Sequence, residues 1–174
     1  MKEFIAACVQ IAITPNDIKA NIEKSVSWLE KAVKENEAEL IVFPETVTTG
    51  FVTNLETNEL WDLLDDAPGH ITAEIQKAAK AHGVHVVWPT YRRGPQRGIL
   101  YNSSILIGPD GGIIGTYDKT HPFPMERADC GGWVTVGNHA DVYEAALGSI
   151  GMIICYDGDF PELSRILAVK GAEV

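Results

Sequence analysis

The fold of this 174-residue chain is decided by residues 151–162, which read Gly151-Met152-Ile153-Ile154-Cys155-Tyr156-Asp157-Gly158-Asp159-Phe160-Pro161-Glu162. A small, apolar segment ends in a cysteine, and a helix begins a few residues later. We predict a strand over residues 149–155 and a helix over residues 160–170, because Pro161 suits the first turn of a helix. A strand followed closely by a helix is typical of α/β proteins.

Cys155 lies on the predicted turn between this strand and this helix. Asp159 and Glu162 have the spacing of a capping box, which would mark the start of the helix. The N-terminal end of a helix carries partial positive charge, so we expect the Cys155 thiolate to be favoured. This geometry parallels the nucleophile elbow of hydrolases. The alternative is a structural cysteine, because cysteine is among the most buried residue types.

The segments before this stretch alternate between predicted strands and predicted helices. Strands are predicted over residues 4–11, 40–43, 84–89, 101–107, 113–117 and 142–147. One helix begins after Asn16 or Asp17, and its apolar stripe is Ile18, Ile22, Val26, Leu29 and Val33. A second helix covers residues 71–81 and is closed by Gly83. The pattern predicts an α/β fold whose sheet mixes parallel and antiparallel pairs.

The remaining segments are predicted turns and loops. The residues Pro109-Asp110-Gly111-Gly112 have the chemistry of a hairpin turn. A long loop runs from Lys119 to about His139, and loops of this length in compact domains are usually functional or disordered. Residues 171–174 look like a helix stop followed by the start of a strand. We therefore expect residues 1–174 to be a single domain that is incomplete at its C-terminal end.

Composition argues against several classes of function. The net charge of −10 disfavours binding to nucleic acid and to an anionic membrane surface. No stretch is long and apolar enough to span a bilayer, and the N-terminus lacks the pattern of a signal peptide. The three cysteines, Cys8, Cys130 and Cys155, form no CxxC pair, which disfavours a zinc ribbon or a disulfide framework. We expect a cytoplasmic protein with reduced thiols, and Cys8 in the core of the first strand.

Two further residues lie at the ends of predicted strands. Glu45 follows the buried strand over residues 40–43, and sites in α/β sheets gather at the carboxyl ends of strands. Lys119 follows the strand over residues 113–117, where it can place a fixed positive charge on a developing oxyanion. Each has a common alternative, which is a solvated loop acid or a surface lysine. With Cys155, they would place an acid, a lysine and a cysteine at three strand ends of one sheet.

The strings around these residues resemble the three signatures of the nitrilase, or carbon–nitrogen hydrolase, superfamily. They are Phe43-Pro44-Glu45, Asp118-Lys119-Thr120-His121 and Cys155-Tyr156-Asp157-Gly158-Asp159-Phe160-Pro161-Glu162. The resemblance covers most of the chain and implies an αββα sandwich that pairs with a second copy, as a homodimer or higher homo-oligomer. It also implies a second glutamate in the loop after the lysine, for which Glu126 is the candidate. The string after Cys155 resembles the amidase branches, whereas true nitrilases usually have Trp and then Glu where this chain has Tyr156 and Asp157.

The resemblance implies hydrolysis of a non-peptide C–N bond in a small amide, through a thioester on Cys155. Glu45 would act as general base, and Lys119 would stabilise the oxyanion together with the backbone N–H of Tyr156. Glu126 would orient the substrate amide or tune Lys119. Ammonia or an amine would leave, and water would then release the carboxylic acid. The scheme requires no metal and no organic cofactor, and its partner is the small-molecule amide.

The sequence leaves other functions open. Within the superfamily, the alternatives are an N-carbamoyl-amide hydrolase, a nitrilase, or transfer of the acyl group to an amine. A second class is an inactive binding or assembly module that keeps the fold. A third class is a redox sensor that pairs Cys155 with Cys130. His121 or His139 could also serve as the base of a Cys–His enzyme.

The sequence also offers two weaker candidates for site residues, an arginine and a pair of histidines. Arg165 lies on the helix after the nucleophile, where a salt-bridge or interface role is at least as common as a role in a site. His82 and His85 flank a predicted turn, but two histidines without a third ligand are a weak metal signal.

Overall fold

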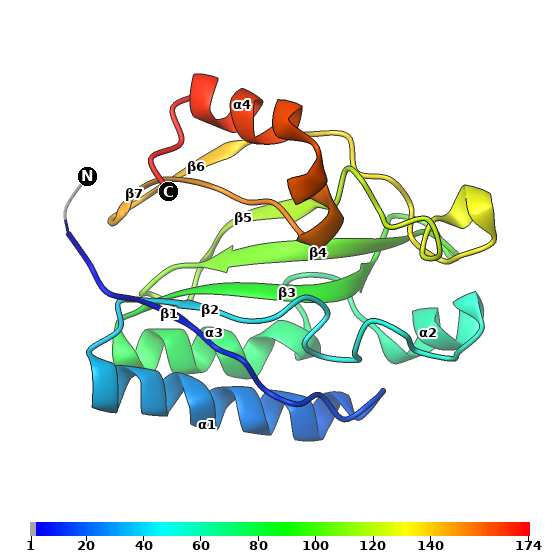
Figure 1. Ribbon diagram of the computed structural model, residues 1–174. Coiled ribbons are helices and arrows are strands. Elements are labelled where there is room, and N and C mark those ends of the chain that lie inside the picture. Colours follow the sequence, from blue (N-terminus) through cyan, green and yellow to red (C-terminus); the bar gives the residue numbers. More distant parts are fainter. Residues whose placement is uncertain (1–2) are drawn as a thin grey trace.

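The computed structural model describes residues 3–174, and its main sheet has five strands in the order β1-β2-β3-β4-β5 (Figure 1). The strands are β1 (Ala6–Cys8), β2 (Leu40–Val42), β3 (His85–Arg93), β4 (Leu100–Ile107) and β5 (Ile113–Asp118). The β1–β2 and β2–β3 pairs are parallel, whereas β3–β4 and β4–β5 are antiparallel. The predicted mixed sheet is therefore confirmed.

Two long helices pack on one face of this sheet (Figure 1). α1 (Ile18–Asn36) begins after Asp17, whose side chain accepts a hydrogen bond from the Ala20 N–H at 3.0 Å. α3 (His70–His82) ends at Gly83, which adopts the left-handed conformation that glycine tolerates, with a φ of 65°. The buried faces of both helices share one core with the sheet, as their helical spacing predicts.

A second layer covers the other face of the sheet (Figure 1). β6 (Val142–Ala145) and β7 (Gly148–Gly151) form an antiparallel pair, and α4 (Pro161–Val169) lies beyond them. A second core between these elements and the main sheet includes Leu106 and Leu163. The layers therefore follow the order helix, sheet, sheet, helix, which is the αββα order that the resemblance implied.

Two predictions about the first third of the chain were wrong or incomplete. β1 is shorter than predicted, and Cys8 is exposed instead of lying in the core. The reason is that β1 lies at the edge of the sheet, where β2 is its neighbour in the strand order. The prediction also missed α2 (Thr57–Leu63), because seven residues are too few to display a clear helical period.

The segment after β7 corrects the predicted start of the helix. β7 ends at Gly151 and not at Cys155, and a 3-10 helix (Cys155–Asp159) lies between β7 and α4. α4 begins after Phe160 without a side-chain cap, so the capping box predicted from Asp159 does not form. Asp159 instead occupies the last position of the 3-10 helix.

Beyond α4, the chain turns back along β7. The Glu173 N–H donates to the Ser149 carbonyl oxygen at 2.7 Å, and the Gly151 N–H donates to the Val174 carbonyl oxygen at 2.8 Å. These bonds agree with the predicted start of a strand after the helix stop.

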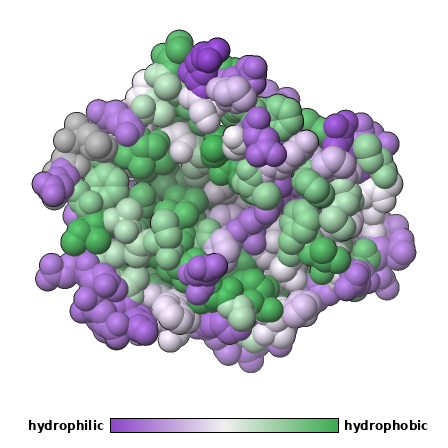
Figure 2. Space-filling view, viewed as in Figure 1, coloured by the Kyte–Doolittle hydropathy of each residue, from purple (hydrophilic) through white to green (hydrophobic). Residues whose placement is uncertain are grey.

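Polar side chains do not cover the molecule evenly. Figure 2 shows apolar side chains gathered around a hollow on the face that Figure 1 presents. Within residues 3–174, none of the helices combines the length and the apolar character needed to cross a membrane.

Candidate active site

Glu45 is placed by a strained turn that follows β2. Thr46, the next residue, is buried and has a φ of 50°, which is unusual for a β-branched residue. Its hydroxyl donates to the Glu45 carbonyl oxygen at 2.8 Å, and the Val47 N–H donates to the Pro89 carbonyl oxygen of β3 at 3.0 Å. Such strain persists only where the surroundings fix the backbone, so this turn holds Glu45 in a defined position beside β3.

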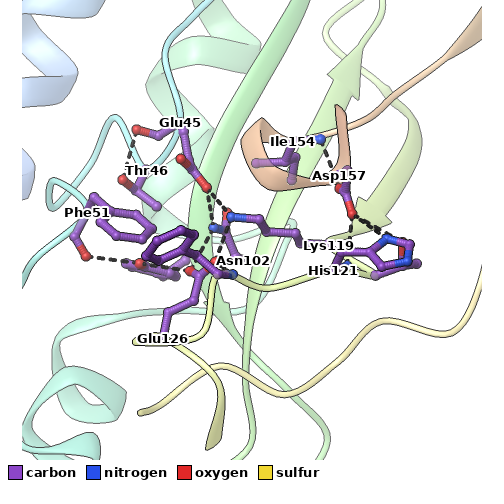
Figure 3. Close-up of polar contacts among 12 residues, drawn as sticks. Glu45, Thr46, Phe51, Asn102, Lys119, His121, Glu126, Ile154 and Asp157 are labelled. Carbon is purple, nitrogen blue, oxygen red and sulfur yellow. Dashed lines mark hydrogen bonds and ion pairs between the residues drawn. The ribbon is translucent and has the colours of Figure 1, made fainter. Parts of the chain in front are cut away.

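Lys119 is completely buried and lies between two carboxylates (Figure 3). Its Nζ is 2.7 Å from Glu45 Oε1 and 2.6 Å from Glu126 Oε1. Burial alone would lower the pKa of Lys119, but the hydrogen bonds and charges of Glu126 and Glu45 raise it above its usual value. Lys119 therefore carries a fixed positive charge, as predicted, although this charge sits in the interior and not on the surface.

Glu126 is as deeply buried as Lys119. Its Oε1 also accepts the Phe123 N–H at 2.8 Å, and its Oε2 accepts the Tyr91 hydroxyl at 3.4 Å. The Glu126 carbonyl oxygen accepts the N–H groups of the two residues that follow Gly132, at 2.9 and 2.7 Å. The structure thus brings the predicted second glutamate into the cluster, on a loop that is fixed at both its backbone and its side chain.

Cys155 opens the 3-10 helix with a φ of 47°, a left-handed conformation that side chains rarely adopt. The residue is exposed. Partial burial of the thiol and the neighbouring Glu45 carboxylate raise the pKa of Cys155, and Lys119 and the Tyr156 N–H oppose them. The prediction that the site favours a thiolate at Cys155 is therefore wrong for the resting site. The physical reason is that α4 begins only at Pro161, while the partly buried Glu45 carboxylate acts directly on the thiol.

The three predicted residues meet, but they do not come from one sheet. Glu45 follows β2 and Lys119 follows β5, and both strands belong to the main sheet. Cys155 follows β7, which belongs to the two-stranded sheet. The site therefore lies where the two layers of the sandwich come together.

Comparison with known proteins agrees with this arrangement. Residues 5–174 match the carbon–nitrogen hydrolase family. The chain belongs to the carbon–nitrogen hydrolase family.

Several relatives are similar over nearly the whole chain. A probable nitrilase of Schizosaccharomyces pombe is 32% identical over 170 residues, covering 97% of this chain and 60% of that protein. A formamidase of Bacillus cereus is 34% identical over 178 residues, covering 98% of this chain and 52% of the formamidase. The crystal structure of Nit3 from Saccharomyces cerevisiae, a member of the nitrilase superfamily, superposes with a TM-score of 0.82 at 25% identity, over 96% of this chain and 60% of that one. The resemblance to the superfamily is confirmed, and the chain spans 52% to 60% of the length of these relatives.

The sequence reasoning missed one member of this cluster, Asn102 of β4. Its Nδ2 donates to Glu45 Oε1 at 2.8 Å and to Glu126 Oε2 at 3.2 Å, so it bridges the same two carboxylates as Lys119 (Figure 3). The Lys119 N–H in turn donates to the Asn102 carbonyl oxygen at 2.8 Å. The available signal was a polar asparagine inside an otherwise strand-like segment, because buried polar groups need partners.

The two histidine candidates make other contacts. The His121 ring stacks on Phe160 with centroids 4.0 Å apart, and the His139 ring contacts the Thr116 carbonyl oxygen at 3.1 Å. The charges that act on the Cys155 thiol are those of Glu45 and Lys119. The geometry therefore favours a glutamate base over a histidine base.

The structure gives little support to the other weak candidates. Among residues 3–174, no group of three or more His, Cys, Asp or Glu side chains could hold a metal ion, so His82 and His85 do not form such a site. Arg165 and Cys130 are exposed.

Proposed function

We propose that this chain carries the catalytic apparatus of a cysteine-dependent amidase, which hydrolyses a small amide to a carboxylic acid and ammonia. The observation that carries the proposal is the buried ammonium of Lys119 held between Glu45 and Glu126, beside the Cys155 thiol. The similarity to a formamidase supports an amide substrate. The match over residues 5–174 supports a single catalytic domain.

Glu45 is the general base of the first step. Because the pKa of Cys155 is raised, the resting thiol holds its proton and needs a base before the sulfur can attack. Lys119 and Asn102 both bind Oε1 of Glu45, which leaves Oε2 to take up the thiol proton. The sulfur then forms a bond to the amide carbon.

The oxyanion that forms is stabilised by Lys119 and the Tyr156 N–H. An ammonium group has three donors, and Glu45 and Glu126 use two of those on Lys119. We assign the third donor to the oxyanion, where a well-placed donor contributes about 3 kcal/mol to the transition state. Glu126 keeps the ammonium charged and aimed throughout the cycle.

The cycle closes with proton transfers through the same glutamate. Glu45 returns its proton to the leaving nitrogen, the C–N bond breaks, and ammonia departs from a Cys155 thioester. Glu45 next removes a proton from water, whose oxygen attacks the thioester carbon. The C–S bond breaks, the acid leaves, and the thiol recovers its proton.

The test is ammonia release from short aliphatic amides, N-carbamoyl compounds and nitriles, with the wild type and Cys155→Ala compared. We expect release from an amide by the wild type and none from Cys155→Ala. The matched control is Cys130→Ala, which removes an exposed cysteine outside the cluster and should retain full activity. If ammonia is released from nitriles alone, the result would instead favour a nitrilase, the activity in the name of the Schizosaccharomyces pombe relative. Absence of turnover in a wild type with a folded circular dichroism spectrum would contradict the proposal and favour a binding module.

A further inference from the structure

The nucleophile turn needs support that the sheet does not provide. β7 ends at Gly151, so the three residues before Cys155 have no strand assignment. Cys155 also has a φ of 47°, and such a conformation persists only when surrounding contacts determine it. Some other group must therefore hold this turn.

Asp157 supplies these contacts within the turn (Figure 3). Its Oδ2 accepts the Ile154 N–H at 2.9 Å, and its own N–H donates to the Ile154 carbonyl oxygen at 3.0 Å. This reciprocal pair closes the chain around Cys155. The Asp157 side chain is completely buried, although Cys155 two residues earlier is exposed.

The same carboxylate also binds the segment that carries Lys119. Asp157 Oδ2 accepts the Tyr117 hydroxyl at 2.7 Å, and Oδ1 accepts the His121 N–H at 2.8 Å. Oδ1 further accepts the Thr120 hydroxyl at 3.2 Å and lies 3.1 Å from Nδ1 of the His121 ring. Tyr117 and His121 lie two residues on either side of Lys119, so one carboxylate holds both flanks of the lysine.

A buried carboxylate is costly unless donors surround it, and this one is surrounded by donors from two separate segments. One segment carries Cys155 and the other carries Lys119. We propose that Asp157 is a positioning residue that fixes the nucleophile turn relative to the Lys119 segment. The inference rests on the proposed function for its effect on turnover, but its geometric part can be tested without substrate.

The main test compares Asp157→Asn with the wild type in kcat, KM and thiol alkylation. Asparagine keeps the shape but offers one acceptor oxygen, so it cannot serve both segments. We expect kcat to fall about 100-fold, the scale of an ångström-sized misplacement of reacting groups, with KM changed less than about threefold. Asp159→Asn is the matched control, because Asp159 is an exposed acid on the same 3-10 helix. That variant should match the wild type.

Alkylation by iodoacetamide, followed by peptide mass spectrometry, reports the position of the thiol without any amide. Glu45 and partial burial raise the pKa of Cys155, so a thiol displaced from both should react at lower pH. In Asp157→Asn we expect the pH midpoint for Cys155 alkylation to fall. The midpoints of Cys8 and Cys130, both exposed, should stay at their wild-type values.

Two outcomes would overturn the inference. One is a variant with a lower melting temperature but wild-type kcat and a wild-type Cys155 midpoint, measured where it is folded. The other is a change in KM alone. If the wild type hydrolyses no amide, the proposed function fails, while the alkylation midpoint still decides the positioning role.

A second variant keeps the test decisive if Asp157→Asn does not fold. Tyr117→Phe keeps the ring but removes the hydroxyl, which donates to Asp157 and also bonds to the hydroxyl and the N–H of Thr120, at 3.0 and 3.2 Å. Only the bond to Asp157 links the two segments. We expect kcat to fall about fivefold, in line with the loss of one hydrogen bond between the two segments, and the Cys155 midpoint to fall in the same direction. Wild-type values for both quantities in this variant would contradict the inference.

Discussion

At the scale of single residues, the site is governed by the balance of charges around a buried lysine. One ammonium and two carboxylates meet with separations of 2.6 and 2.7 Å, and Asn102 provides the remaining donor between the carboxylates. Lys119 and Glu126 are fully buried, so solvent cannot replace a missing partner. Removing any one charge therefore affects stability as well as chemistry.

The Lys119→Met substitution should expose this dependence. It keeps much of the side-chain volume but leaves the Glu45 and Glu126 carboxylates without their shared cation. We expect a loss of about 3–5 kcal/mol in the free energy of unfolding, together with loss of turnover. Urea denaturation measures the first and ammonia release the second.

An exposed lysine provides the control for that experiment. Lys34 pairs with Glu30 on the surface of α1 at 3.1 Å. Lys34→Met should change the free energy of unfolding by less than about 0.5 kcal/mol. If both variants lose equally little stability, the charge-balance account of the cluster is wrong.

Glu45→Gln should separate thiol acidity from catalysis. The Glu45 carboxylate raises the pKa of Cys155, so removing its charge should lower that pKa and move alkylation of Cys155 to lower pH. Turnover should be lost at the same time, because no base remains to take the thiol proton. The alkylation rate of Cys155 against pH and ammonia release are the two measurements. An alkylation midpoint that rises would refute this account.

At the scale of elements, the β4–β5 hairpin places Asn102 and Lys119 side by side. The turn between these strands depends on Gly111, whose φ is 83° and whose carbonyl oxygen accepts the Gln76 side chain of α3 at 2.8 Å. The hairpin is therefore stabilised both by its turn conformation and by a hydrogen bond to a helix of the neighbouring layer.

Alanine substitutions at two glycines should separate the cost of a left-handed backbone from the cost of a steric clash. A Cβ at Gly111 would lie 2.7 Å from the Gln76 carbonyl oxygen, whereas a Cβ at Gly98, which has a φ of 88°, meets nothing within 4 Å. We expect Gly98→Ala to cost about 1 kcal/mol for its left-handed backbone. Gly111→Ala should cost about 3 kcal/mol, because a steric clash adds to the same strain. Thermal or urea unfolding of both proteins checks the difference, and equal losses would exclude the clash.

At the scale of the whole molecule, the main sheet is shared by both cores. Neighbouring residues of β4 face opposite ways, so Ile105 belongs to the core under α1 and α3, and Leu106 belongs to the core under β6, β7 and α4. Each is completely buried. The two halves of the sandwich should therefore be coupled in unfolding.

Ile105→Ala and Leu106→Ala test this coupling. Each should cost about 2–5 kcal/mol through lost burial and a cavity. Because the two cores share a sheet, we expect one transition that shifts as a whole in both variants, with circular dichroism and tryptophan fluorescence coinciding. Two separated transitions in either variant would indicate that the layers unfold independently.

The sequence by itself determined the parts that depend on local patterns. Periodic apolar residues located α1 and α3, and turn residues located the β4–β5 hairpin. Three short motifs also singled out Glu45, Lys119 and Cys155, and the structure brings them together. The cytoplasmic location and the homo-oligomer stay predictions.

Only the tertiary structure decided the rest, because it depends on contacts between distant segments. The bonds from Asn102 to Glu45 and from Tyr117 to Asp157 span 57 and 40 residues, and no local pattern encodes such pairs. The sign of the Cys155 pKa shift was mispredicted for the same reason. The motif indicated a nearby helix end, whereas folding placed a carboxylate and partial burial closer to the sulfur. Charge interactions fall with distance and strengthen away from water, so the packed arrangement sets the chemistry of the site.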